Sequence, residues 1–225
     1  MNVLIFGATG MVGQGVLREC LLDPDVQMVK TVGRAATGIA HTKLREVVHK
    51  DLWDYSSIEG ELSGFDACSF CLGVSSAGMK EAGYERVTYG IALAAAECLS
   101  RLNPQMTFVY VSGAGTDSSE QGRIMWARVK GRTENALLCL PFKAAYMFRP
   151  GAIQPLHGVR SKTAWYRLLY ILMGPLLSTL RPIFPNLILT TAQIGRAMLT
   201  VARHGAAKRI LESRDINALK DPDIP

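Results

Sequence analysis

The chain has 225 residues, a length that suits one domain with room for a small appended lobe. Its hydrophobic content of 48% and charged content of 20% are typical of a globular protein and exclude a disordered chain. The net charge is +6, but Lys and Arg are scattered and no run of five or six like charges occurs. This distribution favours a solvated basic surface, so we expect no nucleic-acid partner.

Strands and helices alternate from the start of the chain. An apolar run at residues 3–6 predicts a buried strand, and apolar residues at helical spacing from Met11 to Leu21 predict a helix. The same reasoning predicts further strands at 26–32, 44–48, 67–72, 107–111 and 144–148, and helices at 80–101 and 122–140. This alternation predicts an α/β fold, a Rossmann-like doubly wound parallel sheet that binds ligands beyond the carboxyl ends of its strands.

The chain changes character after Gly151. Apolar segments at 163–173 and 176–180 and a helix at 191–203 predict a small, mostly helical C-terminal lobe. We therefore expect a nucleotide-binding core at 1–153 and a helical lobe at 154–225 that completes the same domain. The uncharged run 168–180 is too short to span a membrane. Its first interpretation is a buried or partner-facing helix, and its second is contact with a membrane surface.

The five cysteines indicate a reducing compartment, because their number is odd and most lie in apolar runs. Cys68 and Cys71 have C-x-x-C spacing, but within a strand they would face opposite sides of the sheet. The four histidines are isolated from other ligands, so we expect no metal site. With no signal peptide apparent, the expected location is the cytoplasm.

Glycines mark the predicted turn between the first strand and the first helix, in the order G-x-x-G-x-x-G. Gly7 can adopt the unusual dihedral angles of the turn, Gly10 lets a diphosphate approach the backbone, and Gly13 lets the helix pack against the strand. The free N–H groups and the positive dipole end of the helix would face an anion. The alternative is a tight turn with no ligand, but the strand-turn-helix context favours dinucleotide binding.

The residue that ends the second strand indicates which dinucleotide. An acidic residue there binds the ribose hydroxyls of NAD, whereas an arginine accommodates the 2′-phosphate of NADP. The sequence supplies Arg34 and no carboxylate, which favours NADP(H) over a surface arginine without a ligand. Asp51, after the third strand, has two equal interpretations: an acceptor for the adenine amino group, or a turn residue.

Five stretches of the chain are similar to the atypical short-chain dehydrogenase/reductase superfamily, and most similar to its NADPH-binding branch of the human Tat-interacting-protein oxidoreductase type. They are Gly7-Ala8-Thr9-Gly10-Met11-Val12-Gly13, Val32-Gly33-Arg34, Cys71-Leu72-Gly73-Val74-Ser75, Val129-Lys130-Gly131-Arg132-Thr133-Glu134 and Phe148-Arg149-Pro150-Gly151.

The resemblance implies a Rossmann-like fold that binds NADP(H). By this resemblance, Gly73 and its neighbours line the diphosphate and ribose, and Lys130 forms a hydrogen bond with the nicotinamide ribose. The residues that we expect at the cofactor are Gly7, Thr9, Gly10, Met11, Val12, Gly13, Arg34, Asp51, Leu52, Cys71, Leu72, Gly73, Val74, Ser112, Lys130, and Pro150, Gly151 and Ala152 beside the nicotinamide.

The chain departs from the superfamily at its proton donor. Enzymes of the superfamily carry Tyr-x-x-x-Lys on the helix after the fifth strand, where the lysine lowers the pKa of the tyrosine. Here Trp126 stands four residues before Lys130, and an indole does not ionise usefully. The catalytic candidates that remain are Lys130 and Ser112. Ser112 is the only hydroxyl available directly after the fifth strand, although the residue at the superfamily's position is Gly113 if the register is one residue further.

Three accounts of this departure stay open. Another donor serves, such as Tyr84, Tyr89 or Ser112 through a water; the substrate needs no tyrosine acid; or NADPH binds without turnover. The sequence therefore predicts an NADP(H)-dependent oxidoreductase acting on a small, apolar-bodied substrate, as a monomer or homodimer. The alternative is a non-catalytic, NADPH-sensing regulatory or scaffolding protein.

Overall fold

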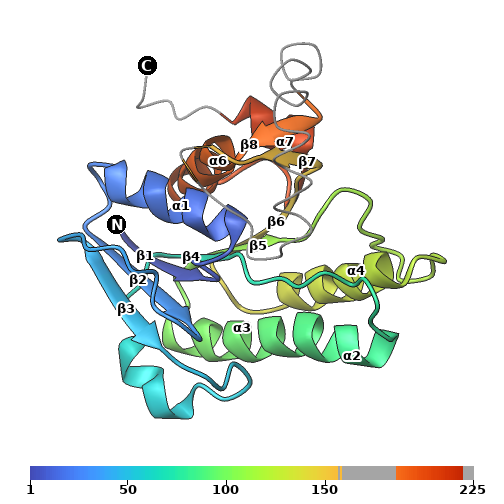
Figure 1. Cartoon of the computed structure of the whole chain (residues 1–225), viewed down its shortest axis with the longest axis horizontal. Helices are drawn as coiled ribbons and strands as arrows, with labels where there is room; N and C mark the ends of the chain where they lie inside the picture. Colours follow the sequence, from blue (N-terminus) through green and yellow to red (C-terminus); the bar gives the residue numbers. More distant parts are fainter. Residues whose placement is uncertain (157, 159–185, 220–225) are drawn as a thin grey trace.

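A computed structural model of the chain describes residues 1–156, 158 and 186–219. Its centre is a parallel sheet of seven strands (Figure 1). In spatial order the strands are β3 (Leu44–Val48), β2 (Met28–Gly33), β1 (Asn2–Phe6), β4 (Ala67–Phe70), β5 (Thr107–Val111), β6 (Ala144–Arg149) and β9 (Ile210–Glu212). The order reverses between β1 and β4, which confirms the predicted doubly wound, Rossmann-like fold.

Helices cover both faces of this sheet, with α1 and α6 above it and α2, α3 and α4 below it in Figure 1. The helices are α1 (Met11–Leu22), the 3₁₀ helix η1 (Ser56–Glu61), α2 (Glu81–Glu85), the π-helix η2 (Arg86–Gly90), α3 (Ile91–Leu102), α4 (Met125–Leu138), α6 (Thr191–His204) and α7 (Ser213–Ala218).

The side chains of β1 alternate between the two resulting cores. Val3 and Ile5 are buried against α1 and α6, whereas Leu4 and Phe6 are buried on the α3 side. This double burial explains why the strand is a continuous apolar run in the sequence, as parallel strands with two covered faces usually are.

Close packing between α1 and α6 ties the C-terminal part of the chain to the first helix. A Cβ at Gly15 would lie 2.6 Å from the Cβ of Thr191, and one at Gly195 would lie 2.8 Å from Cγ of Glu19. The two helices therefore approach closely only because both positions are glycine.

Some elements begin or end elsewhere than the sequence predicts. The second strand starts at Met28, two residues later than expected, and the fourth ends at Phe70, so that Cys71 and Leu72 belong to the following loop. The single helix expected at 80–101 is divided into α2, η2 and α3, because a π-turn interrupts the α-helical hydrogen bonds between Arg86 and Gly90.

The described residues of the C-terminal part include strands that the sequence did not predict. Besides α6 and α7 it contributes β9, which pairs with β6, and β8 (Ile188–Thr190), which pairs with β7 (Ala152–Gln154) in a separate two-stranded sheet. These strands have three residues each, too few for a period-two pattern to identify them. The helices expected at 163–173 and 176–180 lie outside the described residues.

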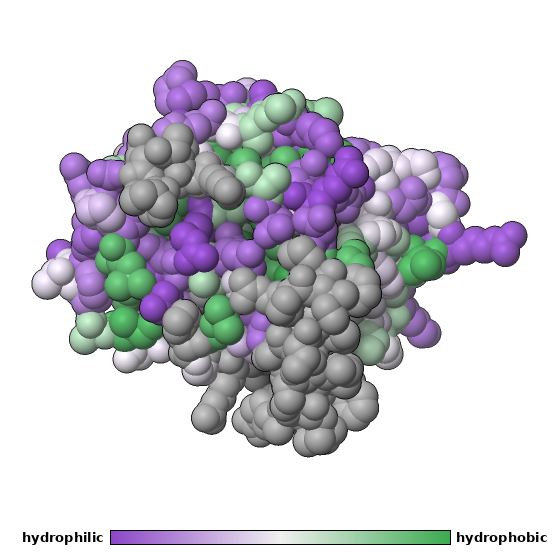
Figure 2. Space-filling view, turned by 90° about the horizontal axis from the view of Figure 1, so that it is seen from above, coloured by the Kyte–Doolittle hydropathy of each residue, from purple (hydrophilic) through white to green (hydrophobic). Residues whose placement is uncertain are grey.

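Figure 2 shows mostly hydrophilic residues on the face seen from above, with hydrophobic residues in small separate groups. Within residues 1–156 and 186–219, no helix has the length and apolar character needed to cross a membrane. The segment for which we expected a membrane-surface contact lies outside the described residues.

Candidate functional site

The glycine turn after β1 has the geometry that the sequence predicts. Gly7 adopts φ of 79°, a left-handed conformation that favours glycine. The Gly10 N–H donates to the Gly7 carbonyl oxygen at 2.9 Å, and Gly10 is the N-cap of α1 with no side-chain hydrogen bond to the helix. A Cβ at Gly13 would lie 2.1 Å from the same carbonyl oxygen, so α1 packs directly on the turn.

This packing places the amino end of α1 at the edge of the sheet where β1, β2 and β4 end. The first N–H groups of a helix have no partner within the helix and carry its positive dipole. An anionic group at this edge would therefore find donors already in place.

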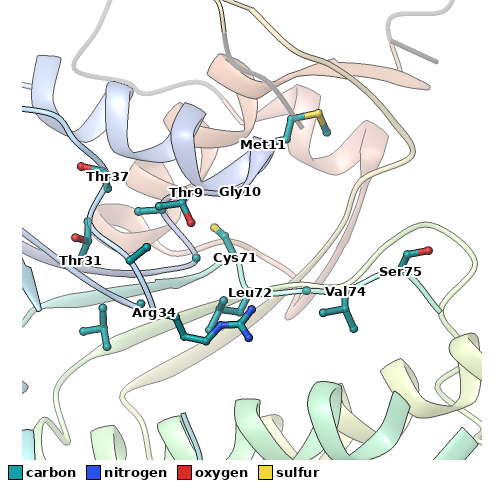
Figure 3. Close-up of a pocket in the computed structure, with 16 residues that line it drawn as sticks. Thr9, Gly10, Met11, Thr31, Arg34, Thr37, Cys71, Leu72, Val74 and Ser75 are labelled. Carbon is teal, nitrogen blue, oxygen red and sulfur yellow. The ribbon is translucent and has the colours of Figure 1, made fainter. Parts of the chain in front are cut away.

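A pocket of about 490 Å³ opens in front of this helix end (Figure 3). It lies beyond the carboxyl ends of β1, β2 and β4. The residues that line it are Gly7, Ala8, Thr9, Gly10, Met11, Thr31, Val32, Gly33, Arg34, Ala35, Thr37, Cys71, Leu72, Gly73, Val74 and Ser75. Nine of the residues that the sequence predicts at a cofactor are among them: Gly7, Thr9, Gly10, Met11, Arg34, Cys71, Leu72, Gly73 and Val74.

Among the described residues that line the pocket, Arg34 is the only charged one. Its side chain extends from the end of β2 toward Leu72 in Figure 3 and is exposed to solvent. The hydroxyl-bearing Thr31 and Thr37 line the same pocket, and both were missed by the sequence reasoning. Both could have been predicted from their position in the chain, because each lies three residues from Arg34, at the end of the same strand or in the loop after it.

Several predicted cofactor residues lie outside the pocket lining. Val12 and Gly13 are on α1 behind the turn. The Asp51 carboxylate accepts from the Trp53 N–H at 3.0 Å, which is the turn geometry of its second interpretation, and Leu52 is buried in the core on the α3 side.

Pro150, Gly151 and Ala152 also lie away from this pocket, after β6. The Pro150 carbonyl accepts from the Ala114 N–H at 2.9 Å, and the Gly151 N–H donates to Ser213 Oγ at 2.7 Å. Ala152 begins β7. These residues therefore hold the end of β6 against the loop after β5 and the start of α7.

Ser112 and Lys130, the two predicted catalytic residues, lie together at the carboxyl end of β5. Lys130 Nζ donates to the Ser112 carbonyl oxygen. Ser112 Oγ donates to Glu134 Oε1 at 2.5 Å or to the Phe148 carbonyl oxygen at 3.1 Å, and the residue is only 8% exposed. The hydroxyl therefore points into the protein between β5 and α4.

Glu134 is the centre of a buried network that the sequence reasoning missed. Its side chain is fully buried and forms an ion pair with Arg149, whose Nε lies 3.0 Å from Glu134 Oε1. Arg149 also contacts Ser118 Oγ at 2.5 Å and Glu212 at 3.3 Å, so the network joins β6, α4, β9 and the loop after β5. The signal was that Glu134 follows Lys130 by four residues, on the same face of a helix.

Burial sets the charge states in this region. Loss of hydration lowers the pKa of Lys130 to about 8, although the nearby Glu134 carboxylate acts in the opposite direction. Burial raises the pKa of Cys71, at the pocket, to about 12, so its thiol stays protonated near neutral pH.

Trp126, four residues before Lys130, is half-buried on α4. A Cβ at Gly115 would lie 3.6 Å from its Cη2 atom, so the indole packs against the loop after β5. Cys68 and Cys71 face opposite sides of the sheet: Cys68 belongs to the core on the α3 side, and Cys71 packs against the core on the α1 side.

No protein-family model matches the chain. Among curated relatives, the mitochondrial protein FMP52-2 of Scheffersomyces stipitis is 30% identical over 156 residues, which are 68% of this chain and 66% of the relative. The mitochondrial protein fmp52 of Aspergillus fumigatus is 30% identical over 160 residues, again 68% of this chain and 66% of the relative. The chain thus spans about two thirds of the length of the curated relatives it matches. The expectation of a cytoplasmic location is wrong by this comparison, since the relatives are named mitochondrial proteins.

Similar solved structures include the dTDP-glucose 4,6-dehydratase DesIV of Streptomyces venezuelae with NAD bound, at 17% identity and a TM-score of 0.69 over 94% of this chain and 75% of that one. Another is WbmF of Bordetella bronchiseptica in complex with NAD⁺, at 13% identity and a TM-score of 0.68 over 96% and 76%. A third is a short-chain dehydrogenase/reductase superfamily protein of Agrobacterium tumefaciens with bound NAD, at 15% identity and a TM-score of 0.65 over 93% and 76%. At these identities the likeness establishes the fold.

Proposed function

Because this chain has the Rossmann fold of the short-chain dehydrogenase/reductase superfamily, we propose that it is an oxidoreductase that binds NADP(H) and acts on a small substrate. The observation that carries the proposal is a pocket at the edge of a doubly wound sheet, where the strand order reverses. The glycine turn lines one side of this pocket and Arg34 lines the other. In folds of this type a dinucleotide lies across the strand ends where the strand order reverses.

The preference for NADP(H) over NAD(H) rests on Arg34. The end of β2 is where the adenosine ribose lies in such folds. Within the part of the chain that the structure describes, no carboxylate lines this pocket to accept hydrogen bonds from ribose hydroxyls. A guanidinium binds a phosphate through two parallel hydrogen bonds. The Thr37 hydroxyl, which also lines the pocket, can add a donor, whereas the Thr31 hydroxyl already donates to Glu46 Oε1 at 3.5 Å. The 2′-phosphate of NADP(H) matches this set of donors.

The other half of the dinucleotide would extend from the pocket over β4 toward β5. Gly73 follows β4 and Gly113 follows β5, and an added Cβ at either position would meet no atom within 4 Å. Gly113 is next in the chain to Ser112, whose carbonyl oxygen accepts from Lys130 Nζ. When bound there, NADPH would supply a hydride from its nicotinamide ring, and the side chains at the end of β5 would face the substrate.

Replacing Arg34 with alanine is expected to weaken NADPH binding by roughly 10- to 100-fold, because a charged hydrogen-bond pair contributes about 1.5–3 kcal/mol. NADH binding should change little. Fluorescence titration of both cofactors measures this. Arg214→Ala, an exposed arginine on α7 outside the pocket lining, is the matched control. Equal affinity of the unsubstituted protein for NADPH and NADH would refute the phosphate assignment.

A second candidate function is favoured by Trp126: a regulatory or scaffolding protein that binds NADPH without turnover. An indole in place of the superfamily's tyrosine removes the usual proton donor. A broad screen of carbonyl substrates separates the two functions. NADPH oxidation supports the oxidoreductase, and tight NADPH binding with no oxidation by any substrate supports the regulator.

A further inference from the structure

Lys130 lies on α4 one helical turn after Trp126, the residue that stands where the superfamily has its tyrosine. Resting on the proposed oxidoreductase function, we propose that the Lys130 ammonium group is itself the general acid that protonates the substrate oxygen during carbonyl reduction. The inference stands on where α4 holds this side chain and on which other polar groups nearby are already occupied.

The position of Lys130 follows from the topology of the sheet. β5 is the neighbour of β4, whose following loop lines the dinucleotide pocket, so the end of β5 lies next along the same sheet edge. Lys130 Nζ is held at that end by the Ser112 carbonyl oxygen. The next residue, Gly113, leaves open space where a side chain would stand. The ammonium group therefore borders the space that we assign to the reacting half of the dinucleotide.

The bond to Ser112 leaves Lys130 able to act. An ammonium group has three N–H donors. Among the described residues, one acceptor is used, the Ser112 carbonyl oxygen. The remaining donors can reach a substrate oxygen. Held by one bond at a strand end, the side chain is partly ordered before the substrate arrives, which reduces the entropy cost of positioning a catalytic group.

The other polar groups near the end of β5 are occupied or turned away. The Ser112 hydroxyl donates into the protein, and Glu134 is fully buried and paired with Arg149. Tyr110 is fully buried below the sheet, and burial raises the pKa of its phenol. Tyr84 is equally buried on α2. Of these groups at the end of β5, Lys130 is thus the one left to exchange a proton.

Its charge state suits the role. Burial lowers the pKa of Lys130 to about 8, near the pH at which a general acid both holds and releases its proton well. Among the described residues, the charged group that acts on Lys130 is Glu134 on its own helix, and Arg149 of β6 and Glu212 of β9 lie behind that carboxylate. The phenol of Tyr110 lies near Glu134 and near the phenol of Tyr84. The ion pairs of Arg128 with Glu81 and of Arg132 with Glu85 lie two residues from Lys130 on the other face of α4.

The reaction balances with these groups. The carbonyl carbon of the substrate gains the hydride that NADPH supplies, and the carbonyl π-bond opens toward oxygen. The oxygen takes one proton from the Lys130 ammonium, which gives the alcohol, NADP⁺ and a neutral Lys130 amine. Water then returns a proton to the amine.

The test compares the unsubstituted protein with Lys130→Arg and Trp126→Tyr in NADPH oxidation by nitrobenzaldehyde and phenanthrenequinone. Because the acid must be protonated, kcat of the unsubstituted protein should be highest below the pKa of Lys130 and should fall as the pH rises through about 8. Lys130→Arg keeps the positive charge but does not release its proton, so kcat should fall roughly 100-fold while NADPH affinity is retained. Trp126→Tyr introduces the superfamily's acid and shows that the assay detects this chemistry.

Each outcome bears on the proposal separately from cofactor binding. A Lys130→Arg variant with unchanged kcat and pH profile would overturn it, because the lysine would then contribute only its charge. A pH profile of the unsubstituted protein with no decline near 8 would overturn it even if the arginine variant failed to fold. Turnover by Trp126→Tyr alone would also overturn it while leaving NADPH binding intact. Failure of the unsubstituted protein to bind NADPH would reject the proposed function itself.

Discussion

Replacing Glu134 with alanine is expected to lower the free energy of unfolding by about 3–5 kcal/mol, the usual cost of removing one partner of a buried ion pair. Glu134 has no exposed surface, and Arg149 is only 8% exposed. Without the carboxylate, the guanidinium would keep only its longer contact with Glu212 and its bond to Ser118. Ser112 Oγ would lose one of its two acceptors and keep the Phe148 carbonyl oxygen at 3.1 Å. Urea unfolding followed by circular dichroism measures the loss.

Two control variants identify the cause. In Glu134→Ala/Arg149→Met both charges are removed, and most of the lost stability should return, because the penalty comes from the charge left unpaired. Glu81→Ala breaks the ion pair between Glu81 and Arg128 on the exposed side of α4, and it should change stability little. If Glu134→Ala unfolds no more easily than Glu81→Ala, the buried network does not hold the end of β5 together.

Replacing Gly13 with alanine is expected to abolish measurable NADPH binding at micromolar cofactor. The new Cβ would lie 2.1 Å from the Gly7 carbonyl oxygen and 2.9 Å from the Ala8 Cα, and both of these are backbone atoms that cannot rotate away. The first turn of α1 would have to move off the glycine turn. Overpacking of this kind costs about 1–3 kcal/mol in stability, and it would also displace the N–H groups that we assign to the diphosphate.

Gly83→Ala is the matched control for this variant, since Gly83 is also in a helix. The atom nearest to a Cβ there is the flexible end of Met79, at 3.9 Å. Alanine should fit without strain and leave NADPH affinity unchanged, with a slight gain in stability. Fluorescence titration and thermal unfolding of both variants measure these effects. NADPH affinity of Gly13→Ala equal to that of Gly83→Ala would contradict the assigned diphosphate position.

Much of the fold was predictable because its core strands are short apolar runs with two buried faces. β1 and β5 were placed within a residue, and the glycine turn was recognised by its position between strand and helix. The π-turn at Arg86–Gly90 was not predictable, since this stretch contains no proline to interrupt a helix. Neither was β9, which is stable as a strand only because β6 supplies its hydrogen-bond partners.

The candidate site divides in the same way. Arg34 and the glycines could be assigned because local rules link residue type to position: glycine to the turn, arginine to the strand end. Asp51 had two equal interpretations, and only the observed bond to the Trp53 N–H shows the turn. Ser112 had the right position along the chain, but the direction of its hydroxyl depends on Glu134, which is 22 residues away.

The sequence by itself determined the alternation of strands and helices, the glycine turn and the arginine at the end of β2, because these depend on neighbours within a few residues. The tertiary structure alone decided that Glu134 and Arg149 pair in the interior and that Lys130 reaches the end of β5. Burial, charge state and side-chain direction depend on which distant segments pack together, and no spacing along the chain contains that information.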